Sequence, residues 1–137
     1  MTMRTNTRTF ATMIAVVATV AGAANASETA QLKRAKELQW SDIEAMPGGK
    51  FTALWSEGNA GAVLMRWPST TKLPSVTREH DVHIVVLAGT VTFDIAGGHK
   101  QIGPGGFADI PKGIAHALGC ESSGECVFLM HAGGGKQ

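Results

Sequence analysis

Histidines are the side chains of this sequence best suited to chemistry near neutral pH. The 137-residue chain contains five of them, and His80 and His83 are separated by only two residues. Neutral imidazoles bind Zn, Fe, Cu or Ni, so these two and His116 could hold one such ion as a three-imidazole set with open coordination positions. Residues three apart on a regular strand point to opposite faces, so this set requires a bend or a loop around His80. The alternative is that His80 and His83 are loop or surface histidines and that His116 is a buried imidazole bonded to a neighbour.

A guanidinium close to these histidines offers a second kind of chemistry. Arg78 could bind a carboxylate ligand through two parallel N–H groups, a geometry that the planar guanidinium favours. The alternative is a salt bridge within the chain, to Glu79 or Asp81. His131 lies at the end of the last apolar run, where it either enters the same cavity or lies at the surface. We expect Arg78, His116 and His131 to be the ligand-binding residues.

The composition excludes several other classes of function. The formal net charge is +1, whereas a general nucleic-acid binder needs a basic excess to neutralise phosphates. The sequence has no Gly-x-Ser-x-Gly nucleophile elbow, no phosphate-binding Gly-x-x-x-x-Gly-Lys-Ser/Thr loop and no Cys-x-x-Cys pair. With 44% hydrophobic and 17% charged residues the chain can bury a core, and its length supports one domain.

Residues 1–26 are typical of a secretory signal peptide. Arg4 and Arg8 precede an apolar stretch over residues 10–21, and residues 24–26 (Ala-Asn-Ala) form a small-x-small cleavage pattern. The alternative is a membrane anchor, but the apolar stretch is shorter than the roughly 20 residues that span a bilayer. We therefore expect cleavage after Ala26, a periplasmic or secreted mature protein, and no membrane contact of the mature form.

The mature chain divides into an N-terminal segment and one β-domain. Residues 27–38 contain good helix formers and predict a short helical or frayed segment. Residues 39–137 contain short apolar runs separated by Gly, Pro and Asn, which is typical of an antiparallel sandwich or barrel. The apolar run at residues 84–87 predicts a strand with both faces covered, one of them by a second subunit. The predicted strands are 51–55, 62–67, 82–87, 91–95, 106–110, 115–118 and 126–130.

Both cysteines lie in the β-domain. Five residues rich in turn formers separate Cys120 from Cys126. If this stretch joins two antiparallel strands, the sulfurs could form a disulfide across the hairpin, as an oxidising compartment permits. The alternative is two unpaired thiols, since spacing alone does not set the distance between them.

The stretch Gly-Gly-Phe-Ala-Asp-Ile-Pro-Lys-Gly-Ile-Ala-His resembles the second motif of the cupin superfamily. That motif consists of a Gly, five residues, Pro-x-Gly, two residues and a His. Its leading positions are occupied by Gly105, Pro111, Gly113 and His116. The Asn that the family pattern places four residues after the His is Cys120 here.

The resemblance extends over nearly the whole mature chain. The sequence Leu-Ala-Gly-Thr-Val at residues 87–91 is similar to the hairpin that closes the first cupin motif, and the likeness covers roughly residues 38–131. It implies an all-β fold, the double-stranded β-helix or cupin jelly roll, and a homodimer.

The first cupin motif departs from the family pattern. That motif supplies two His separated by one residue and then a Glu, which bind one metal together with the second-motif His. Counted back from Gly89, these three positions are Val76, Arg78 and Val82. Val has no lone pair and Arg stays protonated, so neither can ligate. The usual four-ligand metal site of the family therefore cannot form here.

Three functions follow from these observations. The first is an exported cupin-like domain that binds a small molecule or a partner in its barrel, with no cofactor. The second is a metal-dependent cupin enzyme, an oxygenase, isomerase or decarboxylase, that holds Zn, Fe, Cu or Ni through the three-imidazole set. The third is a structural dimer with no chemistry in its pocket.

Overall fold

The computed structural model describes residues 29–133. The predicted signal peptide lies outside the described residues, so cleavage and export stay predictions. Within residues 29–133, no helix is long and apolar enough to cross a membrane. The helical segment expected at residues 27–38 is, in its described part, reduced to η1 (Ala35–Glu37), a 3-10 turn with no buried residue. A helix this short has no buried face, and tertiary packing of such a face is what stabilises most helices in proteins.

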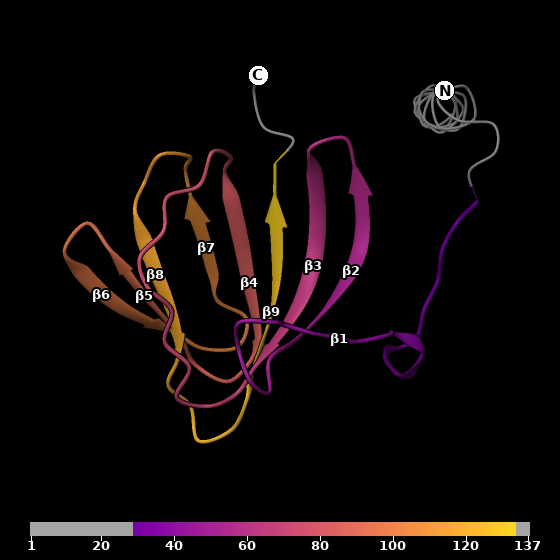
Figure 1. Cartoon of the computed structure of the whole chain (residues 1–137), viewed down its shortest axis with the longest axis horizontal. Coiled ribbons are helices and arrows are strands. Elements are labelled where there is room, and N and C mark those ends of the chain that lie inside the picture. The colour runs from indigo at the N-terminus through magenta and orange to yellow at the C-terminus, as the bar shows by residue number, and fades with distance from the viewer. Residues whose placement is uncertain (1–28, 134–137) are drawn as a thin grey trace, which may run out of the picture. The chain divides into compact units, whose positions relative to one another are not determined.

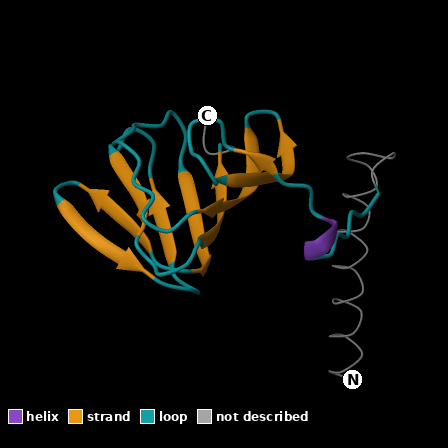
Figure 2. Ribbon diagram, turned by 60° about the horizontal axis from the view of Figure 1, so that its bottom comes forward, coloured by secondary structure: helices purple, strands orange, loops and turns teal. Residues whose placement is uncertain are grey.

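Strands in the described residues form two antiparallel sheets (Figures 1 and 2). The architecture is the double-stranded β-helix that the sequence predicts, and the expected fold class is confirmed. In spatial order, the six-stranded sheet contains β1 (Ser41–Asp42), β2 (Lys50–Glu57), β3 (Ala60–Trp67), β9 (Cys126–Ala132), β4 (Val82–Ala88) and β7 (Phe107–Ile110). The three-stranded sheet contains β6 (Gly98–Ile102), β5 (Val91–Ile95) and β8 (His116–Cys120).

Each predicted strand is present, together with two strands that the sequence did not predict. β6 was not predicted because its sequence, Gly-His-Lys-Gln-Ile, has no apolar alternation, and all of its residues except Ile102 are exposed. It is held by pairing with β5, not by an apolar face. His99 lies on β6, where its Nδ1 is 2.6 Å from Oδ1 of Asp94. The other missed strand, β1, has only two residues.

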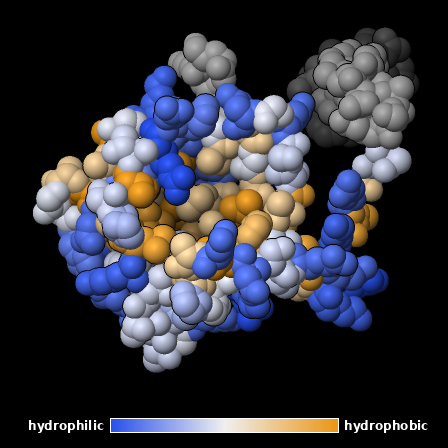
Figure 3. All heavy atoms as spheres, in the orientation of Figure 1, coloured by the Kyte–Doolittle hydropathy of each residue, from blue (hydrophilic) through white to orange (hydrophobic). Residues whose placement is uncertain are grey.

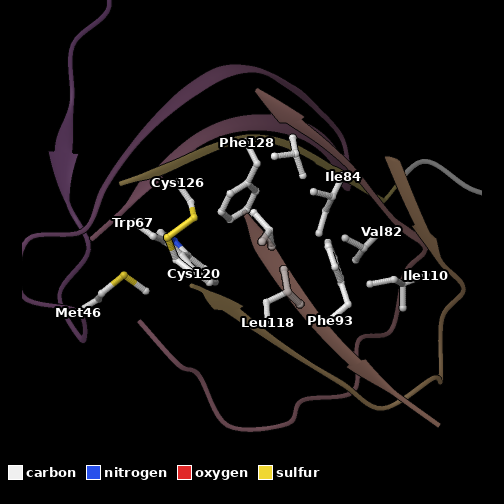
Figure 4. Packing of buried hydrophobic residues seen from close by; sticks show 12 residues of the cluster. Met46, Trp67, Val82, Ile84, Phe93, Ile110, Leu118, Cys120, Cys126 and Phe128 are labelled. Carbon is white, nitrogen blue, oxygen red and sulfur yellow. A yellow bond between two sulfur atoms is a disulfide. The ribbon is translucent and has the colours of Figure 1, made fainter. Parts of the chain in front are cut away.

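The core lies between the two sheets (Figure 4). Alternate residues of β4, Val82, Ile84 and Val86, are buried, and their partners in the cluster include Phe128 of β9. The ring of Phe128 packs edge-on against Trp67, with 4.9 Å between ring centroids. We call the face of the six-stranded sheet that carries these residues its inner face, and the opposite face its outer face.

A disulfide closes one end of the core. Cys120 at the end of β8 and Cys126 at the start of β9 are bonded, and both are fully buried. Of the two alternatives that the sequence left open, the structure therefore has the disulfide. Gly89 lies against this loop with φ of +77°, and a Cβ at this position would be 2.7 Å from the Glu125 carbonyl oxygen. Only glycine fits there without strain.

Candidate ligand-binding site

A cavity of about 330 Å³ lies inside the barrel. Its wall comes from both sheets, from the segment that connects β3 to β4, and from residues 43–46. Figure 3 shows a hollow on this face of the molecule, with an apolar floor and hydrophilic groups on part of its rim. The lining residues are all apolar except Arg78 and His116; the apolar ones are Ile43, Met46, Met65, Trp67, Leu73, Pro74, Val76, Val82, Leu118 and Met130.

His116 is the buried polar side chain of this wall. It is only 3% exposed and begins β8, directly after the turn that contains Pro111 and Gly113. Its Nδ1 lies 2.9 Å from the carbonyl oxygen of Ile114. A carbonyl only accepts, so Nδ1 carries the hydrogen, and Nε2 of the neutral ring is left as an acceptor. No described residue bonds to Nε2, so this nitrogen is available to a ligand.

Arg78 lies at the mouth of the cavity. It lines both the cavity and a more open hollow of about 470 Å³ next to it, which also contains Glu79 and His80. The backbone holds Arg78 close to the motif turn, because the N–H of Gly113 donates to its carbonyl oxygen at 3.0 Å.

The guanidinium of Arg78 has no hydrogen bond or ion pair with any described residue. The salt bridge expected as the alternative, to Glu79 or Asp81, is therefore not formed. Oδ1 of Asp81 instead accepts the backbone N–H of Lys112 at 2.9 Å. The positive charge at the mouth of this apolar cavity remains open to an anionic ligand.

The four positions that correspond to the cupin metal ligands all line this one cavity. Val76 and His116 are joined by two backbone hydrogen bonds of 2.8 and 2.9 Å, and Arg78 and Val82 complete the group. The alignment of the degenerate first motif therefore agrees with the structure. Only one of the four side chains can ligate, so these residues do not fit the metal ion of the usual cupin site.

The structure does not bring the predicted three-imidazole set together. His116 lines the cavity, and His80 lines the more open hollow next to it. His83 lies on the outer face, because its neighbours Val82 and Ile84 point into the core. Within residues 29–133 there is no group of three or more His, Cys, Asp and Glu side chains that could hold a metal ion.

His131 also lies outside the cavity. It is the cross-strand partner of His83, so both side chains lie on the outer face, where their ring centroids are 5.8 Å apart. Its neighbour Met130 lines the cavity in its place. Of the three expected ligand-binding residues, the structure puts Arg78 and His116 at the cavity and His131 on the other side of the sheet.

Three methionines in the cavity wall were missed by the sequence analysis. Met65 and Met130 come from the neighbouring strands β3 and β9, and Met46 comes from the loop between β1 and β2. The alternation of each strand would have identified the first two, since Met65 is two residues from the core residue Trp67, and Met130 two from Phe128. Methionine is unbranched and polarisable, so this part of the wall can adapt to ligands of different shape.

None of the protein-family models and none of the curated proteins matches this sequence. Among solved structures, the chain is similar to KdgF from a Halomonas species, with a TM-score of 0.66 and 19% identity over 76% of this chain and 94% of that one. It is also similar to an RmlC-like cupin from Shewanella frigidimarina, with a TM-score of 0.67 and 15% identity over 80% and 95% of the two chains. A third similar structure is the polyketide cyclase RemF from Streptomyces resistomycificus, with a TM-score of 0.66 and 18% identity over 76% of this chain and 79% of that one. At these identities the likeness establishes the cupin fold and no activity.

Proposed function

We propose that this protein binds a small amphipathic carboxylate in its barrel, with the carboxylate against Arg78 and the apolar part inside the cavity. The observation that carries the proposal is the unpaired guanidinium at the mouth of an otherwise apolar cavity. An arginine pairs with a carboxylate through two parallel hydrogen bonds, which are stronger than bonds between neutral groups. Because residues 1–26 are predicted to be a signal peptide, we propose that the protein acts in the periplasm or outside the cell. That the protein forms a homodimer stays a prediction.

The wall and His116 restrict the ligand further. A cavity of about 330 Å³ is at the small end of ligand pockets, so it suits a compact molecule such as a short-chain or single-ring acid. Nε2 of His116 is an acceptor in the neutral ring, so a hydroxyl or N–H on the ligand can donate to it. The RmlC-like cupin and the polyketide cyclase have the same fold under different names, so the fold by itself does not select an activity.

Calorimetric titration with cinnamate and cinnamamide tests the proposal. The two probes have the same ring and chain, but only cinnamate is charged. We expect cinnamate to bind at least tenfold more tightly. The Arg78→Gln variant should lose about 10- to 100-fold in cinnamate affinity, since a hydrogen bond to a charged group contributes about 1.5–3 kcal/mol.

Arg66 supplies the matched control. It lies on β3 between Met65 and Trp67, so it points to the outer face, where it bonds to Glu125 at 2.9 Å. Arg66→Gln should leave cinnamate affinity unchanged. If cinnamamide binds as tightly as cinnamate, or if the two variants lose affinity equally, the proposal is wrong.

A further inference from the structure

The outer face carries a row of rings on four strands of the six-stranded sheet, with β3 contributing the small Ala62 between the first two rings. Trp55 of β2, His131 of β9, His83 of β4 and Phe107 of β7 follow one another, with ring centroids 5.5, 5.8 and 6.4 Å apart. The two imidazoles at the centre of this row are direct cross-strand partners. None of these residues lines the barrel cavity, so the row is separate from the ligand site described above.

We propose that His83 and His131 chelate a divalent first-row transition ion on the outer face, one ion per chain. Directly opposed residues of an antiparallel pair have Cβ atoms about 4.5–5.5 Å apart on the same face, so both rings can reach one ion. An ion about 2.0–2.1 Å from one nitrogen of each ring would lie roughly 3.2 Å from each ring centre, so the centres could be up to about 6.4 Å apart. The observed separation of 5.8 Å lies within this limit, and because the ring planes are now 28° apart, the two side chains must rotate to direct one nitrogen of each toward the ion.

Asp109 lies where a carboxylate could orient His83 once an ion is bound. It is the cross-strand partner of His83 on β7, and its Oδ1 lies 3.3 Å from Nε2 of His83. A histidine that binds a metal through one nitrogen almost always donates the hydrogen of the other to such a group. With Nε2 facing Asp109, Nδ1 is the nitrogen of His83 left for the ion.

The other imidazole is also available. Apart from ring contacts with His83 and Trp55, His131 has no interaction with a described residue, so both of its nitrogens are unengaged. Two imidazoles leave the remaining coordination positions to water, and the carboxylate acts through His83 without binding the ion itself. Imidazole ligands suit Cu²⁺, Ni²⁺ and Zn²⁺, and the usual order of affinities makes Cu²⁺ the tightest of these.

Titration of the full chain, with no histidine tag, with Cu²⁺ and with Zn²⁺ tests this site by calorimetry. We expect one ion per chain and tighter binding of Cu²⁺. His131→Asn and His83→Asn should each reduce the affinity at least tenfold, and Asp109→Asn should reduce it about 10- to 100-fold, as is usual for a carboxylate that orients a ligand. Circular dichroism confirms that each variant is folded.

Two control variants distinguish this site from others on the chain. His99→Asn changes the other exposed imidazole–carboxylate pair, in which His99 faces Asp94, and His116→Asn changes the imidazole of the cavity. Neither should alter the affinity. Binding that survives in the folded His83→Asn/His131→Asn double variant, or binding that disappears in His116→Asn, would overturn the proposal.

Discussion

The inner and outer faces of the six-stranded sheet carry different chemistry from neighbouring residues of the same strands. On β4, Val82 lines the cavity and His83 lies outside; on β9, Met130 lines the cavity and His131 lies outside. Side chains of a strand alternate between its two faces, so adjacent residues serve different sites. Nearness to a motif in sequence therefore does not make a histidine part of that motif's site.

The cavity receives its polar groups from elsewhere. Within the wall that the structure describes, the six-stranded sheet contributes apolar side chains, while His116 comes from the three-stranded sheet and Arg78 from the connecting segment before β4. This arrangement leaves an apolar chamber with one acceptor inside and one cation at its mouth. It suits the binding of an amphipathic anion better than the coordination of a metal ion.

Removing an aromatic ring from the inner face should lower the free energy of unfolding much more than removing one from the outer face, and this is the largest effect that we expect. Phe128→Ala removes a fully buried ring from the inner face and should lower the free energy of unfolding by about 3–5 kcal/mol. Phe107→Ala removes a ring that is 59% exposed on the outer face and should cost less than about 1 kcal/mol. Urea unfolding measures both. Equal losses would mean that the outer face is buried in solution, as the predicted second subunit would require.

A second prediction restores the missing ligands to the cavity. The triple variant Val76→His, Arg78→His, Val82→Glu puts ligating side chains at three cavity positions beside His116. We expect it to bind a divalent transition ion that stabilises the fold by about 2.7 kcal/mol when the free ion is 100-fold above its Kd. Thermal unfolding with and without Zn²⁺ measures this gain as the stabilisation beyond that of the wild type, because the proposed outer-face site is present in both chains.

The wild-type chain and the triple variant with His116→Ala added are the controls for this experiment. Neither should gain the same stabilisation. A folded triple variant that Zn²⁺ does not stabilise beyond the wild type would show that the four positions do not surround one point.

A third prediction concerns the closed end of the core. Changing both Cys120 and Cys126 to Ala should lower the free energy of unfolding by about 2 kcal/mol, because the bond closes only a short loop in the unfolded chain. Urea unfolding of the variant, and of the wild type with dithiothreitol, measures the loss. Agreement between the two would assign the effect to the bond, whereas no loss in either would contradict the prediction.

The smallest expected effect is on the outer face. Asp109 and His83 are 55% and 40% exposed, and exposed ion pairs contribute little to stability. Asp109→Asn should therefore change the free energy of unfolding by no more than about 0.5 kcal/mol. The same variant is expected to weaken metal binding strongly. A large loss of stability would mean that Asp109 has a structural role and would remove it as a clean test of the metal site.

The sequence predicted the parts of the fold that are governed by apolar alternation and by turn residues. It identified the strands with buried faces and, through the resemblance to the second cupin motif, the inward position of His116. It missed β6, because that strand is held by hydrogen bonding to β5 and buries almost nothing. β5 directly precedes β6 in the chain, but backbone pairing with an exposed strand requires no apolar alternation, so the sequence carries no hydrophobic pattern that marks it.

The candidate site was only partly predictable for a related reason. Arg78 and the degenerate positions Val76 and Val82 followed from motif spacing, and all three line the cavity. His131 was left open because the sequence alone did not show which residues of its strand face the core. With Phe128 buried, the alternation of β9 puts His131, three residues later, on the outer face, and its pairing with His83 agrees.

Methionine-methyl NMR can show whether an amphipathic carboxylate binds inside the barrel cavity. Met46, Met65 and Met130 line the cavity, and the remaining methionines of the chain lie within residues 1–26. Titration with cinnamate should shift the methyl signals of these three residues in the wild type, and much higher concentrations should be needed in Arg78→Gln. If cinnamate binds to the wild type while these three signals do not move, the ligand site lies elsewhere and the account is wrong.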